Sequence, residues 1–189
     1  MKAIVEQLDN LNVDNPGFTC TDDGKSGACI STDTKYRYTL SRVWDNEMPT
    51  MVWVMLNPST ADHSVDDQTI RKCCGFARRH GCGSIVVVNC FAYRATDPKE
   101  LVKAQDPIGP LNTDFIRATL RVAFQRGWIV VAGWGRFPSR KVEALADPTI
   151  KEVQKMQVES FGTTKEGYPR HPCMLGYDTQ RSPWPTRTS

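Results

Sequence analysis

Residues 51–67, MVWVMLNPSTADHSVDD, join an unbroken apolar run to an abrupt polar turn. Residues 51–56 carry no charge, which favours a strand buried on both faces of a parallel sheet. Pro58 has no N–H, so the chain has to leave the sheet at Asn57-Pro58. We therefore expect the polar residues that follow in the crevice beyond the strand's carboxyl end, where open α/β sheets bind ligands.

Two further apolar runs have the same form as this first one, and helical patterns lie between them. The expected strands are SIVVVNC at 84–90, WIVVAG at 128–133 and a short fourth one at 157–161. The expected helices are 67–80, 97–103, 111–126 and 139–146, with 149–156 extending or restarting the last of these after Pro148. This alternation predicts a three-layer α/β/α sandwich with a mainly parallel, four-stranded central sheet.

The two ends of the chain are expected to lie outside this core, which we place at about residues 28–175 of a single domain. Residues 1–26 form a loose lead-in with a short helix at 2–8. Residues 28–31 and 35–44 predict an antiparallel hairpin at the sheet edge, because apolar and polar side chains alternate through Tyr36, Tyr38 and Leu40. The polar, proline-rich tail at 176–189 is expected to be mobile.

Composition predicts an ordinary globular protein. The 189 residues are 40% hydrophobic and 24% charged, with a formal net charge of +3. That charge permits a nucleic-acid partner but does not require one. No apolar run reaches the roughly 20 residues that cross a bilayer, and the first residues lack the apolar stretch of a secretory signal. We expect a cytoplasmic monomer that does not bind membranes.

Seven cysteines are scattered along the chain without any CxxC pair. In a cytoplasmic protein this pattern favours reduced thiols over disulfides. It also favours buried thiols that pack as small hydrophobic groups over a zinc site, so no metal is assigned.

Polar residues follow three of the expected strands where each one ends. Asn57 ends the first strand, Asn89 with Tyr93 and Arg94 follows the second, and Trp134 with Arg136 follows the third. His171 lies in a fourth loop, and the proline after it restricts its backbone. The candidates for a general base are Asp62, Asp66, Asp67 and His171. A turn at Asn57-Pro58 and a helix cap within 62–67 are the alternative interpretations of the same residues.

The outer face of the helix expected at 67–80 is basic, with Arg71, Lys72, Arg78 and Arg79. It is either a solvated surface or a face that contacts phosphates.

Four motifs give the chain a recognisable pattern: LNPSTAD at 56–62, DDQTIRKCCGFARRHG at 66–81, VVVNCFAYRATDP at 86–98 and KEGYPRHPCML at 165–175. They resemble an uncharacterised bacterial and phage domain family marked by the NPSTAD motif. Their order is also similar, more remotely, to the uracil-DNA glycosylase superfamily. There, one strand ends in Asn-Pro, a second ends in a base-reading asparagine, and a late His-Pro loop faces the base.

The remote resemblance implies a role for several residues of this chain. Asn57 would position the attacking water, Asn89 would read the base, and His171 would stabilise the departing base. Phe91 or Tyr93 would stack on that base. With these we group Asp62 as catalytic and the following as substrate-binding: Ser59, Thr60, Asp67, Arg94 and Trp134. The nucleic-acid backbone would meet Lys72, Arg79 and Arg170.

Three functions are consistent with this sequence. The first is an enzyme acting on a nucleobase or nucleotide, most concretely a DNA glycosylase-like hydrolase of a modified or mismatched base that needs no cofactor. The second is a non-catalytic module that binds modified nucleic acid or a nucleotide. The third is another transferase or hydrolase on the same scaffold, since fold does not fix function.

Overall fold

A computed structural model describes residues 1–8, 17–59 and 65–184. Within these residues eight strands form one sheet in the order β1-β2-β3-β5-β4-β6-β7-β8. The strands are β1 (Phe18–Asp22), β2 (Ser26–Ser31), β3 (Arg37–Val43), β4 (Thr50–Met55), β5 (Ser84–Asn89), β6 (Ile129–Ala132), β7 (Val158–Ser160) and β8 (Ser182–Pro183). No helix in the described part of the chain is long and apolar enough to span a membrane.

The α/β class is confirmed, but the expected mainly parallel, four-stranded sheet is wrong. The sheet is mixed, because β1, β2, β3 and β5 pair antiparallel in succession and β8 pairs antiparallel with β7. Parallel pairing joins β5 to β4, β4 to β6, and β6 to β7. The three apolar runs of the sequence are therefore neighbouring parallel strands with their carboxyl ends together, as their pattern predicts.

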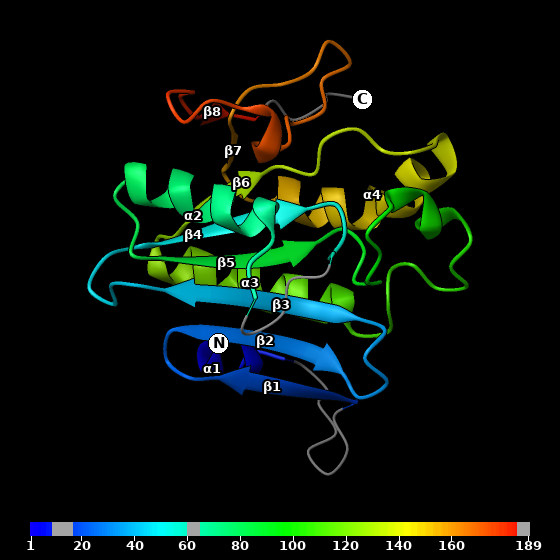
Figure 1. Ribbon diagram of the computed structural model, residues 1–189, viewed down its shortest axis with the longest axis horizontal. Coiled ribbons are helices and arrows are strands. Elements are labelled where there is room, and N and C mark those ends of the chain that lie inside the picture. The colour runs from blue at the N-terminus through cyan, green and yellow to red at the C-terminus, as the bar shows by residue number, and fades with distance from the viewer. Residues whose placement is uncertain (9–16, 60–64, 185–189) are drawn as a thin grey trace.

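Helices cover both faces of this sheet (Figure 1). One face is covered by α2 (Gln68–Arg79), and the other by α1 (Lys2–Val5), α3 (Asn112–Arg126) and α4 (Arg140–Gln154). Two short 3₁₀ helices, η1 (Pro98–Val102) and η2 (Pro172–Met174), follow β5 and β7. Side chains alternate along β4, so Trp53 and Met55 pack toward α2 while Val52 and Val54 pack toward α3.

The described residues of both chain ends form more secondary structure than their composition suggests. The expected loose lead-in contains an additional strand, β1, which pairs with β2, so the predicted β2–β3 hairpin is not at the sheet edge. The expected mobile tail contributes β8, and Trp184 is buried with its ring 4.8 Å from that of Trp134. Helix α4 continues through Pro148, where Pro148 and Ala144 are both exposed, so water can satisfy the carbonyl that the proline leaves free.

A β-bulge in β3 breaks the side-chain alternation that the sequence predicts there. Cys29 pairs with Thr39 and Ile30 pairs with Arg37, so Tyr38 is an extra residue in β3. Tyr38 stacks on Phe115 of α3, with ring centroids 4.8 Å apart, whereas Leu40 packs toward α2 on the opposite face. Tyr38 and Leu40 are therefore not on one face, and the bulge turns Arg37 to the α2 face, as bulges commonly redirect a side chain.

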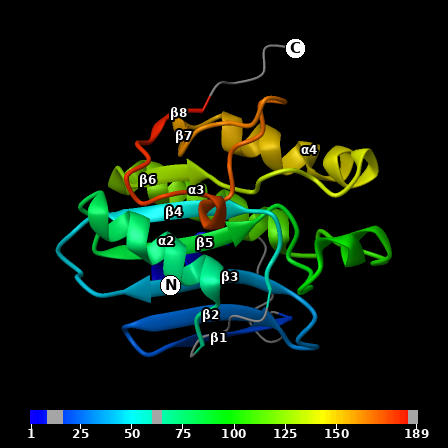
Figure 2. The same cartoon turned by 45° about the horizontal axis from the view of Figure 1, so that its top comes forward.

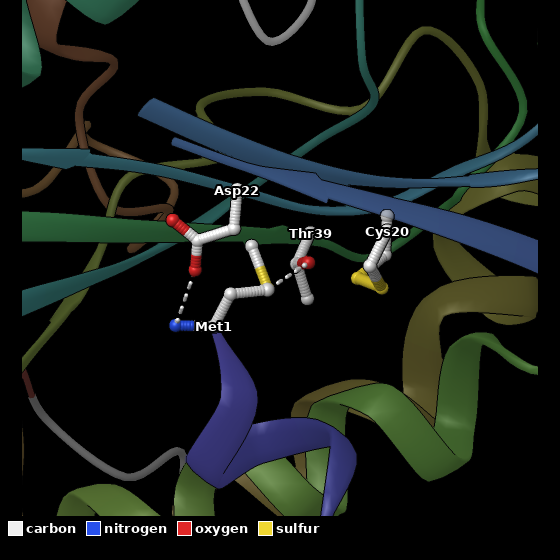
Figure 3. Close-up of a disulfide and its surroundings, with 5 residues drawn as sticks. Met1, Cys20, Asp22 and Thr39 are labelled. Atoms are coloured by element: carbon white, nitrogen blue, oxygen red, sulfur yellow. Dashed lines mark hydrogen bonds and ion pairs between the residues drawn. A yellow bond between two sulfur atoms is a disulfide. The ribbon is translucent and has the colours of Figure 1, made fainter. Parts of the chain in front are cut away.

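A disulfide joins Cys20 of β1 to Cys29 of β2, two residues that lie directly opposite in the sheet (Figure 3). The expectation that all seven cysteines are reduced is wrong for this pair, because pairing of β1 with β2 brings their Cα atoms to 4.1 Å. Met1 packs beside the bridge, with its amino group 3.6 Å from the Asp22 carboxylate and its sulfur 3.1 Å from Thr39 Oγ1.

The other five cysteines are free thiols, as predicted. Cys73, Cys82 and Cys90 are buried, and burial raises the pKa of each of these thiols, that of Cys90 to about 12. They therefore remain protonated and pack as small apolar groups. Within the described residues, no group of three or more His, Cys, Asp or Glu side chains is arranged to hold a metal ion.

Candidate functional site

A cavity of about 410 Å³ lies at the carboxyl ends of β4, β5 and β6, under the first turn of α2. Ligand-binding cavities commonly have volumes of about 300–1,000 Å³. Its polar lining comes from seven segments of the chain and comprises Arg37, Asn57, Ser59, Asp67, Gln68, Thr69, Asn89, Thr96, Trp134, Arg136 and His171. Of the five residues predicted to share one pocket, Asn57, Asn89 and His171 line this cavity, whereas Arg94 does not and Asp62 lies outside the described residues.

Asn89 forms part of the cavity floor and is 1% exposed. It shares a sheet face with Ile85 and Val87, so its side chain lies on the α2 side. Its Nδ2 has no hydrogen-bond partner among the described residues. Because an unpaired buried donor costs about 1–3 kcal/mol, a ligand acceptor at this position would recover a substantial interaction.

Asn57 connects two walls of the cavity. Its Nδ2 donates to the carbonyl oxygens of Ala95, at 2.7 Å, and Pro58, at 3.1 Å. Both partners can only accept, which fixes the orientation of the amide. Oδ1 takes part in neither bond and is the atom that can accept a hydrogen bond from a water. Asn57 is thus both a turn residue and a site residue, so the two interpretations of this position are compatible.

His171 lies in the loop after β7 and lines the cavity beside Asp67. Its Nδ1 accepts from the Cys173 N–H at 3.3 Å, so the proton of the neutral ring is on Nε2. Burial lowers the pKa of His171, while the negative charge of Asp67 opposes this shift. The imidazole is therefore neutral at pH 7 and offers an N–H donor.

Glycine at position 135 allows the His171 loop to approach the end of β6. Gly135 has φ +73°, and its N–H donates to the Pro169 carbonyl at 3.0 Å. A Cβ on Gly135 would lie 3.3 Å from the His171 Cβ, a closer contact than side chains usually make. This close approach brings His171, from the loop after β7, to the carboxyl ends of β4, β5 and β6.

Asp67 is the N-cap of α2, as one interpretation of the sequence predicts. One carboxylate oxygen accepts from the Ile70 N–H at 2.8 Å. It is the only carboxylate among the described residues that line the cavity. Asp66 is bound instead by Arg42 of β3, at 2.7 and 2.8 Å. Asp62 and Thr60 lie outside the described residues.

Three predicted substrate-binding residues do not line the cavity: one lies in the core and two line a neighbouring hollow. Phe91 is 0% exposed and packs in the core on the α3 side, so its assignment as a stacking residue is wrong. Tyr93 and Arg94 line a separate hollow that shares Ser59, Ala95 and Thr96 with the cavity. Arg94 also donates to the Thr34 carbonyl at 3.2 Å.

The three residues assigned to the nucleic-acid backbone are all engaged within the protein. Lys72 donates to the Leu175 carbonyl at 2.7 Å and lies 4.2 Å from the Tyr177 ring centroid. The guanidinium group of Arg79, also on α2, lies 4.0 Å from the same ring centroid. Arg170 donates to the Met174 carbonyl at 3.4 Å. The contacts of Lys72 and Arg79 hold the segment after β7 against α2. In Figure 2 this segment lies beside α2.

Sequence reasoning missed Arg37, which is 2% exposed and lines the cavity. The alternating pattern of β3 places it on the wrong face, and only the bulge at Tyr38 brings it to the α2 side. A basic residue among apolar neighbours was the one available signal, but such a residue is usually solvent-exposed.

Residues 37–173 match the family described as "Protein of unknown function (DUF1643)". No curated protein matches the chain significantly, and no solved structure does so. The similarity to uracil-DNA glycosylases thus stays a prediction. The matched residues make up more than two thirds of the 189-residue chain and include every described residue that lines the cavity. The chain therefore belongs to this DUF1643 family of proteins of unknown function.

Proposed function

We propose that the cavity binds a nucleobase and that the protein hydrolyses the N-glycosidic bond of that base. The observation that carries this proposal is the unpartnered Nδ2 of Asn89 at a buried cavity floor. A heterocycle with a ring carbonyl would supply the missing acceptor, and a cavity of about 410 Å³ has room for such a ring.

The reaction needs a positioned water and stabilisation of the leaving base. Water adds to the sugar carbon C1′ while the C1′–N bond breaks, and the bonding pair leaves with the base. One proton of the water passes to the base and the other remains as the new hydroxyl hydrogen. Asn57 Oδ1 would orient the water, because its Nδ2 is already held by Ala95 and Pro58. The Nε2–H of His171 would donate to the base as negative charge develops on it.

A second candidate is a non-catalytic module that binds a base or nucleotide. It is favoured by the state of Asp67, the only carboxylate of the described cavity lining, which is used to cap α2. A site without a free carboxylate in its described lining supports binding more directly than general base catalysis.

Incubation with DNA carrying a panel of normal and modified bases tests the proposal, with free bases and abasic sites as the readout. Base release that is lost in Asn89→Leu, but kept in Asn46→Leu, would support hydrolysis. Asn46 is a matched control because it is exposed in the loop before β4. Retention of one base without release would favour the binding module, and neither retention nor release would refute both candidates for bases within DNA.

A further inference from the structure

We infer that the occupant of the cavity is a free nucleoside monophosphate rather than a base within a nucleic-acid strand, with Arg136 as the residue that binds its phosphate. This inference rests on the proposed function for the position of the base at Asn89. It adds the class of substrate and a specificity-determining residue that is distinct from the groups assigned to bond cleavage.

The first supporting observation is the state of the basic surface of α2. Arg71 donates to the Asp66 carbonyl, and Arg78 lies 4.0 Å from the ring centroid of Trp44. Lys72 and Arg79 are held by the segment at 175–177, as described above. All four basic side chains of this helix therefore already make contacts within the protein. These contacts orient the side chains toward groups of the protein, and a nucleic-acid backbone would have to displace them to pair with the cations.

The second observation is the excess of donors in the cavity itself. The Asn89 Nδ2 is a buried donor without a partner among the described residues. At the first turn of α2, Asp67 takes the Ile70 N–H, while the N–H groups of Gln68 and Thr69 have no intrahelical acceptor. Arg37 and Arg136, each with a guanidinium group, are the two basic residues among the described residues of the same lining. Such a lining fits a ligand that is both anionic and rich in acceptors.

The third observation is where the two arginines lie. Arg37 is buried on β3, and its backbone N–H donates to the Ala92 carbonyl just beyond β5. Arg136 is exposed and follows β6, on the other side of β4 and β5. At roughly 4.8 Å per strand, β3 and β6 are about 14 Å apart. A base at the buried side and a phosphate at the exposed side would use both ends of this span.

The exposed position of Arg136 is what assigns it to the phosphate. A phosphomonoester carries close to two negative charges and remains strongly hydrated, so it suits the open end of a cavity better than its buried floor. A guanidinium pairs with phosphate through two parallel N–H donors. A phosphodiester inside a strand has one charge and two bulky substituents, and it has to continue out of the cavity in both directions.

Calorimetric titration of the full chain tests this assignment, with the common deoxynucleoside 5′-monophosphates, the matching nucleosides and a single-stranded oligonucleotide as probes. We expect one monophosphate to bind at least tenfold tighter than its nucleoside. Arg136→Gln should remove this difference and leave the nucleoside affinity unchanged. Arg140→Gln is the matched control, since Arg140 is exposed at the start of α4 outside the cavity lining and should keep the preference.

The possible results separate this inference from the proposed function. Monophosphate binding that depends on Arg136, without release of any base, would support the inference and refute hydrolysis. Base release from oligonucleotides alone would support hydrolysis and overturn the inference. Equal affinity for nucleosides and monophosphates, tighter binding of the oligonucleotide, or no binding of any probe would each overturn the inference.

Discussion

Two buried asparagines lie on opposite faces of the sheet at the end of β5 and use their amides differently. Asn112 of α3 is 0% exposed, and its Nδ2 donates to the Asn89 carbonyl at 3.0 Å and the Cys90 carbonyl at 3.1 Å. Asn89 is equally buried, but its Nδ2 faces the α2 side and has no partner in the described chain. One amide completes the fold, and the other remains available to a ligand.

The difference between these two amides shows on which face of the sheet a buried hydrogen-bond donor is left without a partner. Beyond the end of β5 the carbonyl groups leave the ladder, and Asn112 satisfies them from the α3 side. The Asn112 Oδ1 has no partner in the described residues, yet the two bonds that Asn112 Nδ2 donates hold the end of β5, where Asn89 lies. On the cavity side, no described residue forms a hydrogen bond with the Asn89 Nδ2. The stability of the fold and the capacity to bind are thus divided between two residues of the same type.

The largest effect on stability is expected from Asn112→Ala. It leaves two buried carbonyl groups without a donor, so the free energy of unfolding should fall by about 2–4 kcal/mol. Chemical denaturation measures this loss. Thr119→Val on the same helix is the matched control, because Thr119 is 0% exposed and its Oγ1 has no partner in the described chain. A loss no greater in Asn112→Ala than in Thr119→Val would contradict the assigned role.

Asn89→Leu should show the reverse behaviour. It removes a buried donor that has no partner, so the free energy of unfolding should change by less than about 1 kcal/mol or increase. Affinity for the bound nucleotide should fall about tenfold or more. A loss of this size is expected when one hydrogen bond between protein and ligand is removed from a desolvated site. Denaturation and calorimetric titration on the same preparation test both statements. A destabilisation as large as that of Asn112→Ala would show that Asn89 has a structural role instead.

The cavity on the Asn89 side of the sheet also depends on the segment that carries His171, because His171 lines it. Tyr177 packs on α2 between Lys72 and Arg79, and a Cβ on Gly75 would lie 2.5 Å from its ring. Thr69 Oγ1 also lies 3.5 Å from Cys173 Sγ at the start of this segment. The small residue at position 75 therefore allows the tyrosine to hold residues 171–177 against the helix.

Tyr177→Ala should release this segment and expose His171. The pKa of His171, which burial lowers, should then rise toward its ordinary value of 6.5. NMR titration of the imidazole measures the change. Tyr177→Phe keeps the ring that faces both cations, so the His171 pKa should stay lowered. An equal rise in both variants would mean that the hydroxyl, rather than the ring, holds the segment.

The smallest expected effect is on the pH dependence of stability. Since the folded pKa of His171 lies below 6.5, the unfolded chain binds more protons just below pH 6.5, and stability is lost as the pH falls through the folded pKa. His171→Gln should therefore flatten the decline of unfolding free energy below pH 6.5. Burial also lowers the pKa of His80, so His80→Gln should flatten the same decline independently. An unchanged slope in His171→Gln would contradict the burial of this imidazole.

Much of the site-bearing region could be predicted from the sequence because the relevant signals are local. The apolar run before Asn57 and the similar run before Asn89 indicate buried strands, and consecutive strands joined through helices place their carboxyl ends at one edge. The N-cap at Asp67 follows from its position before an amphipathic helix. These features depend on short-range periodicity and on the donors and acceptors of single residues.

The rest depends on pairing between distant segments, which no local pattern contains. Whether Arg37 faces the cavity is decided by one extra residue in the pairing of β3 with β2. The same kind of long-range contact brings Cys20 against Cys29, buries Phe91 and places Tyr177 against Lys72 and Arg79 of α2. A sequence fixes which side chains are basic, apolar or thiol-bearing. Their partners and their exposure are set only when strands and helices that are far apart in the chain come together.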